Sequence, residues 1–476
     1  MPALLLATVV SGVFCGLAFP LTRLQPLGWV AVVPFLIAVR RAGSLGTALF
    51  LGWVWMTVMN YTVADWLASG IARYFEQPLL VGVGFFFGIS TFMTAIHHMA
   101  FTACYRALGR GPRYVVPMLA AAAWVASEFA RTNTLTGNPW AILGYSQIGI
   151  LPLMQIADLT GVYGISFVLA VVNAALAEVW LARRSGGAAL RDAMRGLGLA
   201  GAAVLLVVGY GVVRLHSTGL VVLNVPPVKI GLVQANLDVG SQWREELYGR
   251  NLDGYLRLTH GLLTDEDPPA VVFWPENALT FFLADEPLYR AAIARVLAPS
   301  GAELVTGGPR MLASYPSVYY GSVFLVSSRG AILATYDKQK LLPFGEYFPF
   351  AAIGVLRRHF GRVRELTPGA DSPLLPTAAG LGGVTICNEA MFPEIAAARV
   401  REGATYLIDP ANDNWFTSKF SEQQFDVVTL RAVEQRRYLV RASTSGPSAI
   451  VDPLGRVVRR SEVFTQTTLT GEIRPS

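Results

Sequence analysis

The chain has 476 residues, of which 53% are hydrophobic and only 15% are charged, whereas ordinary soluble domains carry about 25% charged residues. This balance excludes an ordinary, wholly soluble globular protein. The net charge of +6 does not indicate nucleic-acid binding, because the basic residues do not cluster with aromatic residues as a binding stripe would. Long uncharged runs lie before about residue 222 and charged residues concentrate after it, so we expect a membrane domain at 1–222 and a soluble domain at 223–476.

Seven apolar segments of the first domain are candidate membrane spans, because a spanning helix needs about 20 predominantly apolar residues. The second segment is short and contains Pro34. The first lacks the basic region of a signal peptide and is followed at once by further apolar segments, so an uncleaved anchor is favoured over a cleaved signal. The segments are 3–20, 27–39, 46–61, 78–104, 115–130, 160–182 and 196–213.

The loops between these segments differ in their arginine content. One alternate set carries only Arg23, Arg73 and Arg131. Because cytoplasmic loops are enriched in Lys and Arg, the richer set is predicted to be cytoplasmic. Seven crossings then place the N-terminus in the cytoplasm and the soluble domain on the opposite face, which in a Gram-negative bacterium is the periplasm. The richer set contains Arg40, Arg41, Arg106, Arg110, Arg113, Arg183, Arg184, Arg191 and Arg195.

The periodicity of the apolar residues changes at about residue 228, near the start of the second domain. Helix-like stretches at 284–298 and 421–437 lie among its short β-rich runs, and two of the runs read as a hairpin with Arg329-Gly330 at the turn. This pattern predicts an α/β domain with a mixed sheet. No GxGxxG follows a strand, no GxxxxGK[ST] occurs and no Cys or His pair has zinc spacing, so we expect no cofactor and no metal. The runs are VKIGLVQA, VVFWPE, ELVTGG, SVFLVS, AILATY, GVTIC, ATYLID and YLVRAS.

Cys387 is the only cysteine of the second domain, in the stretch VTICNEAMFPE. It is either a small buried hydrophobe or a reactive thiol, and a reactive thiol needs a base or a cationic neighbour. No histidine lies near it in sequence, but Glu276 follows the run VVFW and Lys338 follows ILATY. Glu346 lies in the turn PFGEY. Strand ends that present Glu, Lys and Cys are consistent with one site at one edge of a sheet.

The motifs WPEN, YDKQKLLPFGEY and ICNE resemble those of the nitrilase superfamily, whose members use a Glu–Lys–Cys triad on an α-β-β-α sandwich. With the multi-span N-terminal half, the resemblance narrows to the bacterial apolipoprotein N-acyltransferases. Nearly the whole chain takes part in it: GNPWAILGYSQ at 137–147, DLTGVYGISF at 158–167, VQANLDVGSQW at 233–243 and NDNWF at 412–416 are similar to stretches of that family. The implied fold is a multi-span helical membrane domain followed by a nitrilase-like α/β domain.

The resemblance also implies a reaction. A phospholipid would donate a fatty acyl chain to the cysteine, and the resulting thioester would pass it to the N-terminal cysteine amine of a diacylglyceryl apolipoprotein. Glu276 would be the general base, Lys338 the positively charged third member and Cys387 the nucleophile. Glu389 would face the same side as Cys387 if the strand continued through it. The supporting residues of the site would be Glu346, Glu389, Trp243, Asn388 and Trp415.

The sequence departs from the family pattern at several places. Asn388 follows the nucleophile where the family has Tyr, and Gly321 replaces an Asn. The stretch TSKFSEQQFD lacks the usual Gly-Asp, and the chain ends at TLTGEIRPS where the family has an eighth membrane helix, so either this is a shortened branch or the C-terminus has been removed. Two alternative functions stay open: a membrane-anchored amidase of the same superfamily, and a catalytically inactive scaffold that binds lipoproteins.

Overall fold

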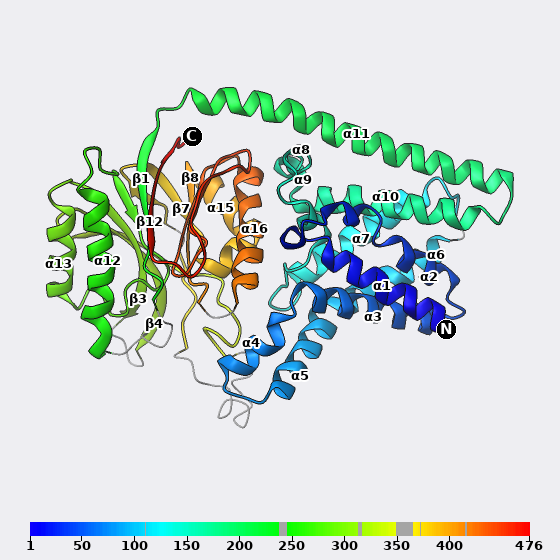
Figure 1. The fold of residues 1–476 in the computed structure, drawn as a ribbon, viewed down its shortest axis with the longest axis horizontal. Coiled ribbons are helices and arrows are strands. Elements are labelled where there is room, and N and C mark those ends of the chain that lie inside the picture. The colour runs from blue at the N-terminus through cyan, green and yellow to red at the C-terminus, as the bar shows by residue number, and fades with distance from the viewer. Residues whose placement is uncertain (110, 238–244, 313–316, 349–364, 372, 415–416) are drawn as a thin grey trace. The chain divides into compact units, whose positions relative to one another are not determined.

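The computed structural model describes residues 1–476 except 110, 238–244, 313–316, 349–364, 372 and 415–416. The chain divides into two compact units, Met1–His216 and Ser217–Ser476. The first unit is helical and the second is built from strands and helices, as Figure 1 shows. The predicted fold class, an apolar helical region followed by an α/β sandwich, is confirmed.

Each predicted apolar segment of the first unit coincides at least in part with a helix. Strong helix formers and apolar residues fill these helices, and short 3₁₀ or π turns (η) interrupt them. The elements are α1 Pro2–Leu17, η1 Pro20–Thr22, η2 Gln25–Trp29, α2 Val33–Arg41, α3 Leu45–Val63, α4 Trp66–Tyr74, α5 Leu79–Ile89, η3 Ser90–Ala95, α6 Ile96–Leu108, α7 Val116–Asn133, η4 Leu143–Gln147, α8 Leu151–Met154, α9 Ala157–Thr160, α10 Val162–Ala182 and α11 Gly187–Leu223.

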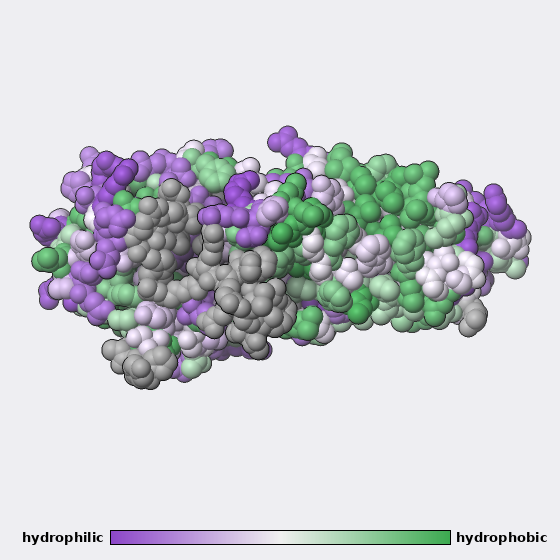
Figure 2. Space-filling model, turned by 90° about the horizontal axis from the view of Figure 1, so that it is seen from below, coloured by the Kyte–Doolittle hydropathy of each residue, from purple (hydrophilic) through white to green (hydrophobic). Residues whose placement is uncertain are grey.

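Among the described residues, three helices are long and apolar enough to cross a membrane: Leu79–Leu108, Val162–Ala182 and Gly187–Ser217. The last of these buries only 17% of its most apolar window within the protein. Figure 2 shows apolar side chains gathered over the helical unit, whereas polar side chains predominate over the α/β unit. Apolar helices that expose their side chains in this way are those of a membrane protein.

The predicted span 27–39 is wrong in its first half. Residues Gln25–Trp29 form a 3₁₀ turn, and the α-helix begins only at Val33, with Pro34 in its first turn. Pro favours the first turn of a helix because it lacks a backbone donor. Asn173 replaces hydrogen bonds that the interrupted helix lacks: it accepts one from Val32 N (3.0 Å) and donates one to Gly28 O (2.9 Å). The nine-residue helix α2 is only about 14 Å long, too short to cross the bilayer core alone.

The α/β unit contains two six-stranded sheets. The first has the order β12-β1-β2-β3-β4-β5 and the second β11-β10-β9-β8-β7-β6, and both mix parallel and antiparallel pairs. The predicted hairpin is the antiparallel pair β4–β5, with Gly330 at φ +80°. The strands are β1 Val228–Gln234, β2 Val271–Phe273, β3 Glu303–Leu312, β4 Val318–Val326, β5 Ile332–Asp337, β6 Leu375–Thr377, β7 Gly380–Val384, β8 Tyr406–Ala411, β9 Leu439–Ser443, β10 Ala449–Val451, β11 Val457–Arg460 and β12 Thr467–Ile473.

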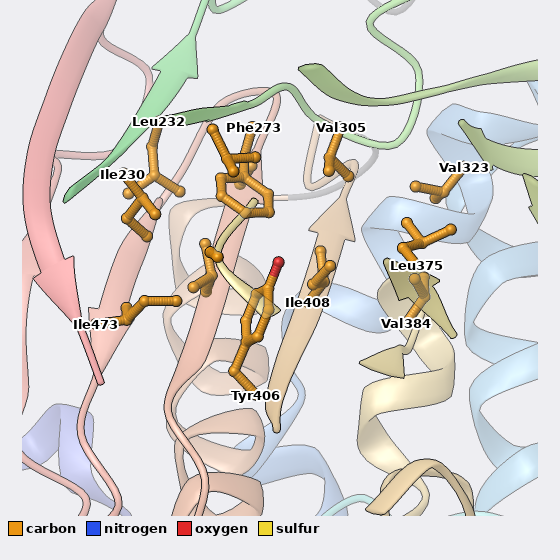
Figure 3. Close-up of a cluster of buried hydrophobic side chains, with 14 of the residues drawn as sticks. Ile230, Leu232, Phe273, Val305, Val323, Leu375, Val384, Tyr406, Ile408 and Ile473 are labelled. Carbon is orange, nitrogen blue, oxygen red and sulfur yellow. The ribbon is translucent and has the colours of Figure 1, made fainter. Parts of the chain in front are cut away.

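The two sheets stack face to face over an apolar core, shown in Figure 3, to which Phe273 and Val305 contribute from one sheet and Tyr406 and Ile408 from the other. Val272 of β2 faces away from this core, and it packs against helices together with outward-facing residues of the neighbouring strands. A strand buried on both faces needs a continuous apolar run, which VVFW supplies. Figure 1 shows α12 and α13 outside the first sheet and α15 and α16 outside the second. The helical elements of this unit are η6 Glu245–Leu247, α12 Tyr248–Leu263, α13 Pro287–Leu297, η7 Cys387–Met391, α15 Pro393–Arg401 and α16 Ser418–Gln435.

Candidate active site

Glu276, Lys338 and Cys387 each follow the carboxyl end of a strand. Glu276 comes three residues after β2, Lys338 directly after β5 and Cys387 three residues after β7. β5 runs in the same direction as β2, because two antiparallel pairings separate it from β3, which is parallel to β2. Parallel strands end at the same edge of a sheet, so Glu276 and Lys338 lie at one edge of the first sheet, where ligands bind in many α/β folds. Cys387 follows a strand of the second sheet, so the predicted single sheet edge is corrected to the ends of two sheets.

Lys338 is the centre of a buried ionic cluster. Its Nζ donates to Glu276 Oε1 at 2.8 Å and to Glu346 Oε1 at 2.6 Å, and its side chain is only 2% exposed. The other oxygen of Glu346 accepts a hydrogen bond from Leu342 N (2.7 Å), which fixes the carboxylate. Burial disfavours the ammonium, but the two carboxylates outweigh burial and hold the pKa of Lys338 well above its usual value. Lys338 is therefore a fixed positive charge at neutral pH.

Glu276 lies in a loop that folds tightly over strand β3. Gly307 N donates to Pro275 O (3.0 Å), and a Cβ at Gly307 would come within 2.0 Å of the carbonyl oxygen of Glu276. Only glycine permits this approach, so the GG of the run ELVTGG positions the carboxylate. Burial and the neighbouring Glu346 raise the pKa of Glu276, whereas Lys338 and a hydrogen bond with Cys387 lower it, and the net direction is upward. A carboxylate with a raised pKa is a stronger base than an exposed one.

Cys387 lies in a strained turn at which the chain changes direction. Its φ is +50°, which side chains other than Gly rarely adopt, and it begins the 3₁₀ turn η7. Such outliers are concentrated at functional sites. Burial, together with the carboxylates of Glu276 and Asp413, raises the pKa of the thiol well above its usual value, against the opposing effect of Lys338. The resting thiol is therefore protonated, and it lies close enough to Glu276 for each group to shift the pKa of the other.

The structure corrects the expected orientation of Glu389. Strand β7 ends at Val384, before Cys387, so the argument that alternate residues face the same side does not apply. The Glu389 carboxylate instead accepts hydrogen bonds from Ile386 N (2.8 Å) and from the backbone nitrogens of Gln339 (2.7 Å) and Lys340 (2.9 Å). The hydroxyl of Tyr336 donates to it as well (2.9 Å). Glu389 therefore binds the loop of the lysine to the loop of the cysteine.

The remaining predicted residues have different outcomes. Asn388 is half-buried in the turn that Cys387 begins. Trp243 and Trp415 lie outside the described residues. Gly321, which departs from the family pattern, accepts a hydrogen bond from the backbone nitrogen of Lys338 at 2.9 Å. A small residue thus lies directly beside the backbone of the lysine.

The structure also places four polar residues near the cysteine that the sequence patterns did not single out: Asp409, Asp413, Gln424 and Arg441. Arg441 is buried and forms ion pairs with both aspartates. The parallel register of β8 and β9 sets Asp409 opposite Arg441. A signal was present: the runs ATYLID and YLVRAS each carry one charge in an otherwise apolar strand, and the two charges are opposite in sign.

Two stacked mixed sheets with helices outside each define a domain of the carbon-nitrogen hydrolase class, and the Carbon-nitrogen hydrolase family matches residues 230–476. The Apolipoprotein N-acyltransferase N-terminal domain matches residues 11–175. The chain belongs to the apolipoprotein N-acyltransferase family.

Two relatives of the same name as this family agree with the assignment. The Apolipoprotein N-acyltransferase of Geobacter metallireducens is 32% identical over 98% of this chain and 89% of its own length. The protein of the same name from Pseudomonas aeruginosa is 31% identical over 89% of this chain and 78% of its own. Among solved structures, Nit3 of Saccharomyces cerevisiae, a nitrilase superfamily member, is 18% identical with a TM-score of 0.41, over 52% of this chain and 90% of that one.

Proposed function

We propose that this N-acyltransferase uses Cys387, Glu276 and Lys338 to move a fatty acyl chain from a membrane phospholipid to the N-terminal cysteine amine of a diacylglyceryl apolipoprotein. The observation that carries the proposal is the convergence of one thiol, one base and one fixed cation, with Lys338 Nζ 2.8 Å from Glu276 Oε1 and the charges of both Glu276 and Lys338 acting on the thiol. These are the parts that acyl transfer through a covalent intermediate requires.

In the first half-reaction, Cys387 Sγ attacks the ester carbonyl of the phospholipid while Glu276 takes the thiol proton. A base in this position typically contributes about 10²–10⁴ in rate. The Lys338 ammonium stabilises the oxyanion of the tetrahedral intermediate. The C–O bond then breaks, Glu276 returns the proton to the leaving alkoxide, and lysophospholipid departs from a thioester at Cys387.

In the second half-reaction, the neutral α-amine of the apolipoprotein attacks the thioester carbonyl and Glu276 accepts a proton from the nitrogen. The C–S bond breaks, the amide product leaves, and the thiolate of Cys387 recovers the proton from Glu276. A thioester retains enough acyl-transfer potential to drive amide formation, which explains the use of Cys rather than Ser.

Both substrates are lipids, so the membrane part has a role in bringing them to the site. We infer a multi-pass protein of the bacterial inner membrane, with a membrane domain at 1–222 and a catalytic domain at 223–476 on the periplasmic side. The support for this orientation is the division of nine arginines against three between alternate loops, counted in the sequence.

Intact-protein mass spectrometry tests the covalent step. After incubation of the full chain with phospholipid vesicles, we expect a fatty-acyl mass gain that hydroxylamine removes, and a diacylglyceryl peptide should discharge it. Cys387→Ala should show no gain. Cys104→Ala is the matched control, because Cys104 is an exposed free thiol outside the site, and it should acylate like the parent.

An adduct that persists in Cys387→Ala, or folded parent protein that neither forms an adduct nor releases fatty acid across several lipids, would rule out the mechanism. The second result would favour the binding scaffold. Release of free fatty acid with no transfer to the peptide would favour the hydrolase.

The pH dependence of acyl-enzyme formation should respond to Glu346. The like charge of Glu346 raises the pKa of Glu276, so Glu346→Gln should lower that pKa. Because the base acts as the carboxylate, the acid limb of the rate profile should move to lower pH. Lys338 loses one of its two carboxylate partners, so an alkaline limb should move the same way. The check is a pH series of acylation rates, with Glu394→Gln, an exposed glutamate on α15, as the unshifted control. An acid limb that stays in place or rises would contradict the assignment of Glu276 as base.

A further inference from the structure

The mechanism above does not use four polar side chains near Cys387: Asp409, Asp413, Gln424 and Arg441. Arg441 of β9 forms an ion pair with Asp409 of β8 and donates to Asp413 at 2.9 Å. The three charged side chains are 0% exposed. Ser443 donates a further hydrogen bond to Asp413 at 2.7 Å. So costly a burial of charge calls for an explanation beyond stability, because a well-packed apolar cluster is often as stable.

Gln424 of helix α16 connects this cluster to the nucleophile. Its Oε1 accepts a hydrogen bond from Arg441 Nη2 at 2.7 Å, and its Nε2 lies 3.8 Å from Cys387 Sγ, within hydrogen-bonding distance for sulfur. The side chain is only 2% exposed. A guanidinium can only donate, so the end of the amide that faces Arg441 must be the oxygen. The amide NH₂ is thereby directed at the sulfur.

A side-chain donor to the sulfur would add to the backbone of Asn412, which already lowers the thiol pKa. Glu276, which raises the thiol pKa, and Lys338, which lowers it, face it from the first sheet. Asp413 and Arg441 face it from the second, with Asp413 raising the pKa. Glu346 and Asp409 act on it through their ion pairs with Lys338 and Arg441. When the thiolate forms, Glu276 holds its proton, the carboxylate of Asp413 still disfavours the negative sulfur, and Lys338 is still paired with Glu346.

We propose that Gln424 is a further catalytic residue, whose amide donates a hydrogen bond to the sulfur of Cys387 whenever the sulfur carries negative charge. Arg441 is the positioning residue that turns the amide toward the sulfur. The thiolate is fully formed when the C–S bond of the thioester breaks, so the donor acts most strongly in the second half-reaction. This inference rests on the proposed function only in taking Cys387 as the nucleophile.

The test compares Gln424→Glu with Gln424→Met in the full chain carrying Cys104→Ala. The Glu variant keeps an acceptor for Arg441 but removes the donor and adds a negative charge. The Met variant is neutral and keeps neither the acceptor for Arg441 nor the donor to the sulfur. The pH dependence of iodoacetamide alkylation at Cys387, followed by peptide mass mapping, reports the thiol pKa without any lipid substrate. We expect the profile to move to higher pH in both variants and further in the Glu variant.

The discharge of a preformed acyl-enzyme by a diacylglyceryl peptide should slow by about ten- to a hundredfold in both variants, the usual effect of losing a hydrogen bond to a charged group. Gln435→Glu, the same change at the end of the same helix, should move neither measurement. An unshifted alkylation profile in folded Gln424→Glu and Gln424→Met would overturn the proposal. Failure of the proposed function is distinguished separately, because it would appear as acyl transfer that survives in Cys387→Ala.

Discussion

Replacement of Lys338 by Met is expected to slow acyl-enzyme formation by at least about 10³-fold. The loss of one oxyanion donor alone commonly costs about 10²–10³. Here the base is lost with it: Glu276 and Glu346 would face each other in a buried site without their shared cation, which is 2.8 Å and 2.6 Å from them in the parent. One of the two would then take up a proton, and the pKa of Glu276 would rise further. Single-turnover acylation with phospholipid vesicles measures the rate.

Lys340→Met is the matched control for this experiment. The ammonium of Lys340 lies 4.5 Å from the ring centroid of Phe392, and a cation–π contact of this kind is worth about 0.5–1 kcal/mol. The control variant should therefore stay within a few-fold of the parent rate. If both variants lost activity equally, the loop rather than the charge of Lys338 would be responsible. A Lys338→Met enzyme that acylates at the parental rate would remove Lys338 from the mechanism.

Replacement of Arg441 by Met is expected to have the largest effect on stability. It would leave Asp409 and Asp413 buried without a counter-charge, and breaking a buried ion pair by removing one partner costs about 3–5 kcal/mol. For a unit of this size, the midpoint of thermal unfolding should fall by roughly 10 °C. The measurement is thermal unfolding of the full chain in detergent.

The loss of stability in Arg441→Met should depend on pH. Burial and the like charge of Asp413 already raise the pKa of Asp409 to about 6, against the lowering effect of Arg441. Without Arg441 the folded pKa rises further, so the folded variant binds more protons than the unfolded one and gains stability relative to it as the pH falls. The difference from the parent should therefore shrink between pH 8 and pH 5.5. Arg456→Met, which removes a half-exposed arginine whose ion pair spans 4.0 Å, should cost little at either pH. A pH-independent deficit would contradict the buried-charge explanation.

The main strands and the gathering of Glu276, Lys338 and Cys387 were predictable for one physical reason. A strand buried on both faces must be a short apolar run, so its end is visible in the sequence, and polar residues that directly follow such ends lie at an edge of the sheet. Each of the eight β-rich runs contains or overlaps a strand. The ionic cluster around Lys338 follows from the same pattern, because Glu346 lies only eight residues further on, in a turn that brings it back to the lysine.

The errors have equally specific causes. The expected orientation of Glu389 holds only if a strand continues through it, and nothing in the sequence VTICNE reveals that the chain turns at Cys387 with φ +50°. Gln424 lies on a helix 37 residues beyond the cysteine, and no local pattern connects the two. The first half of the span 27–39 was misjudged because its backbone is satisfied by Asn173, which is more than a hundred residues away. Long-range hydrogen bonds produce no periodic pattern in the sequence from which they could be predicted.

The carboxylate of Glu389 has a mechanical consequence. Lys338 belongs to one sheet and Cys387 to the other, and the apolar layer between them is held by a force without direction, which tolerates sliding of one surface over the other. A slip of 1 Å at a reacting centre can cost a hundredfold in rate. Glu389 holds backbone groups of the loops that follow β5 and β7 in one set of directional bonds. Glu389 is therefore one of the buried side chains that hold the lysine in register with the thiol, together with Arg399, whose guanidinium donates to Tyr336 and Gln339 across the same two sheets.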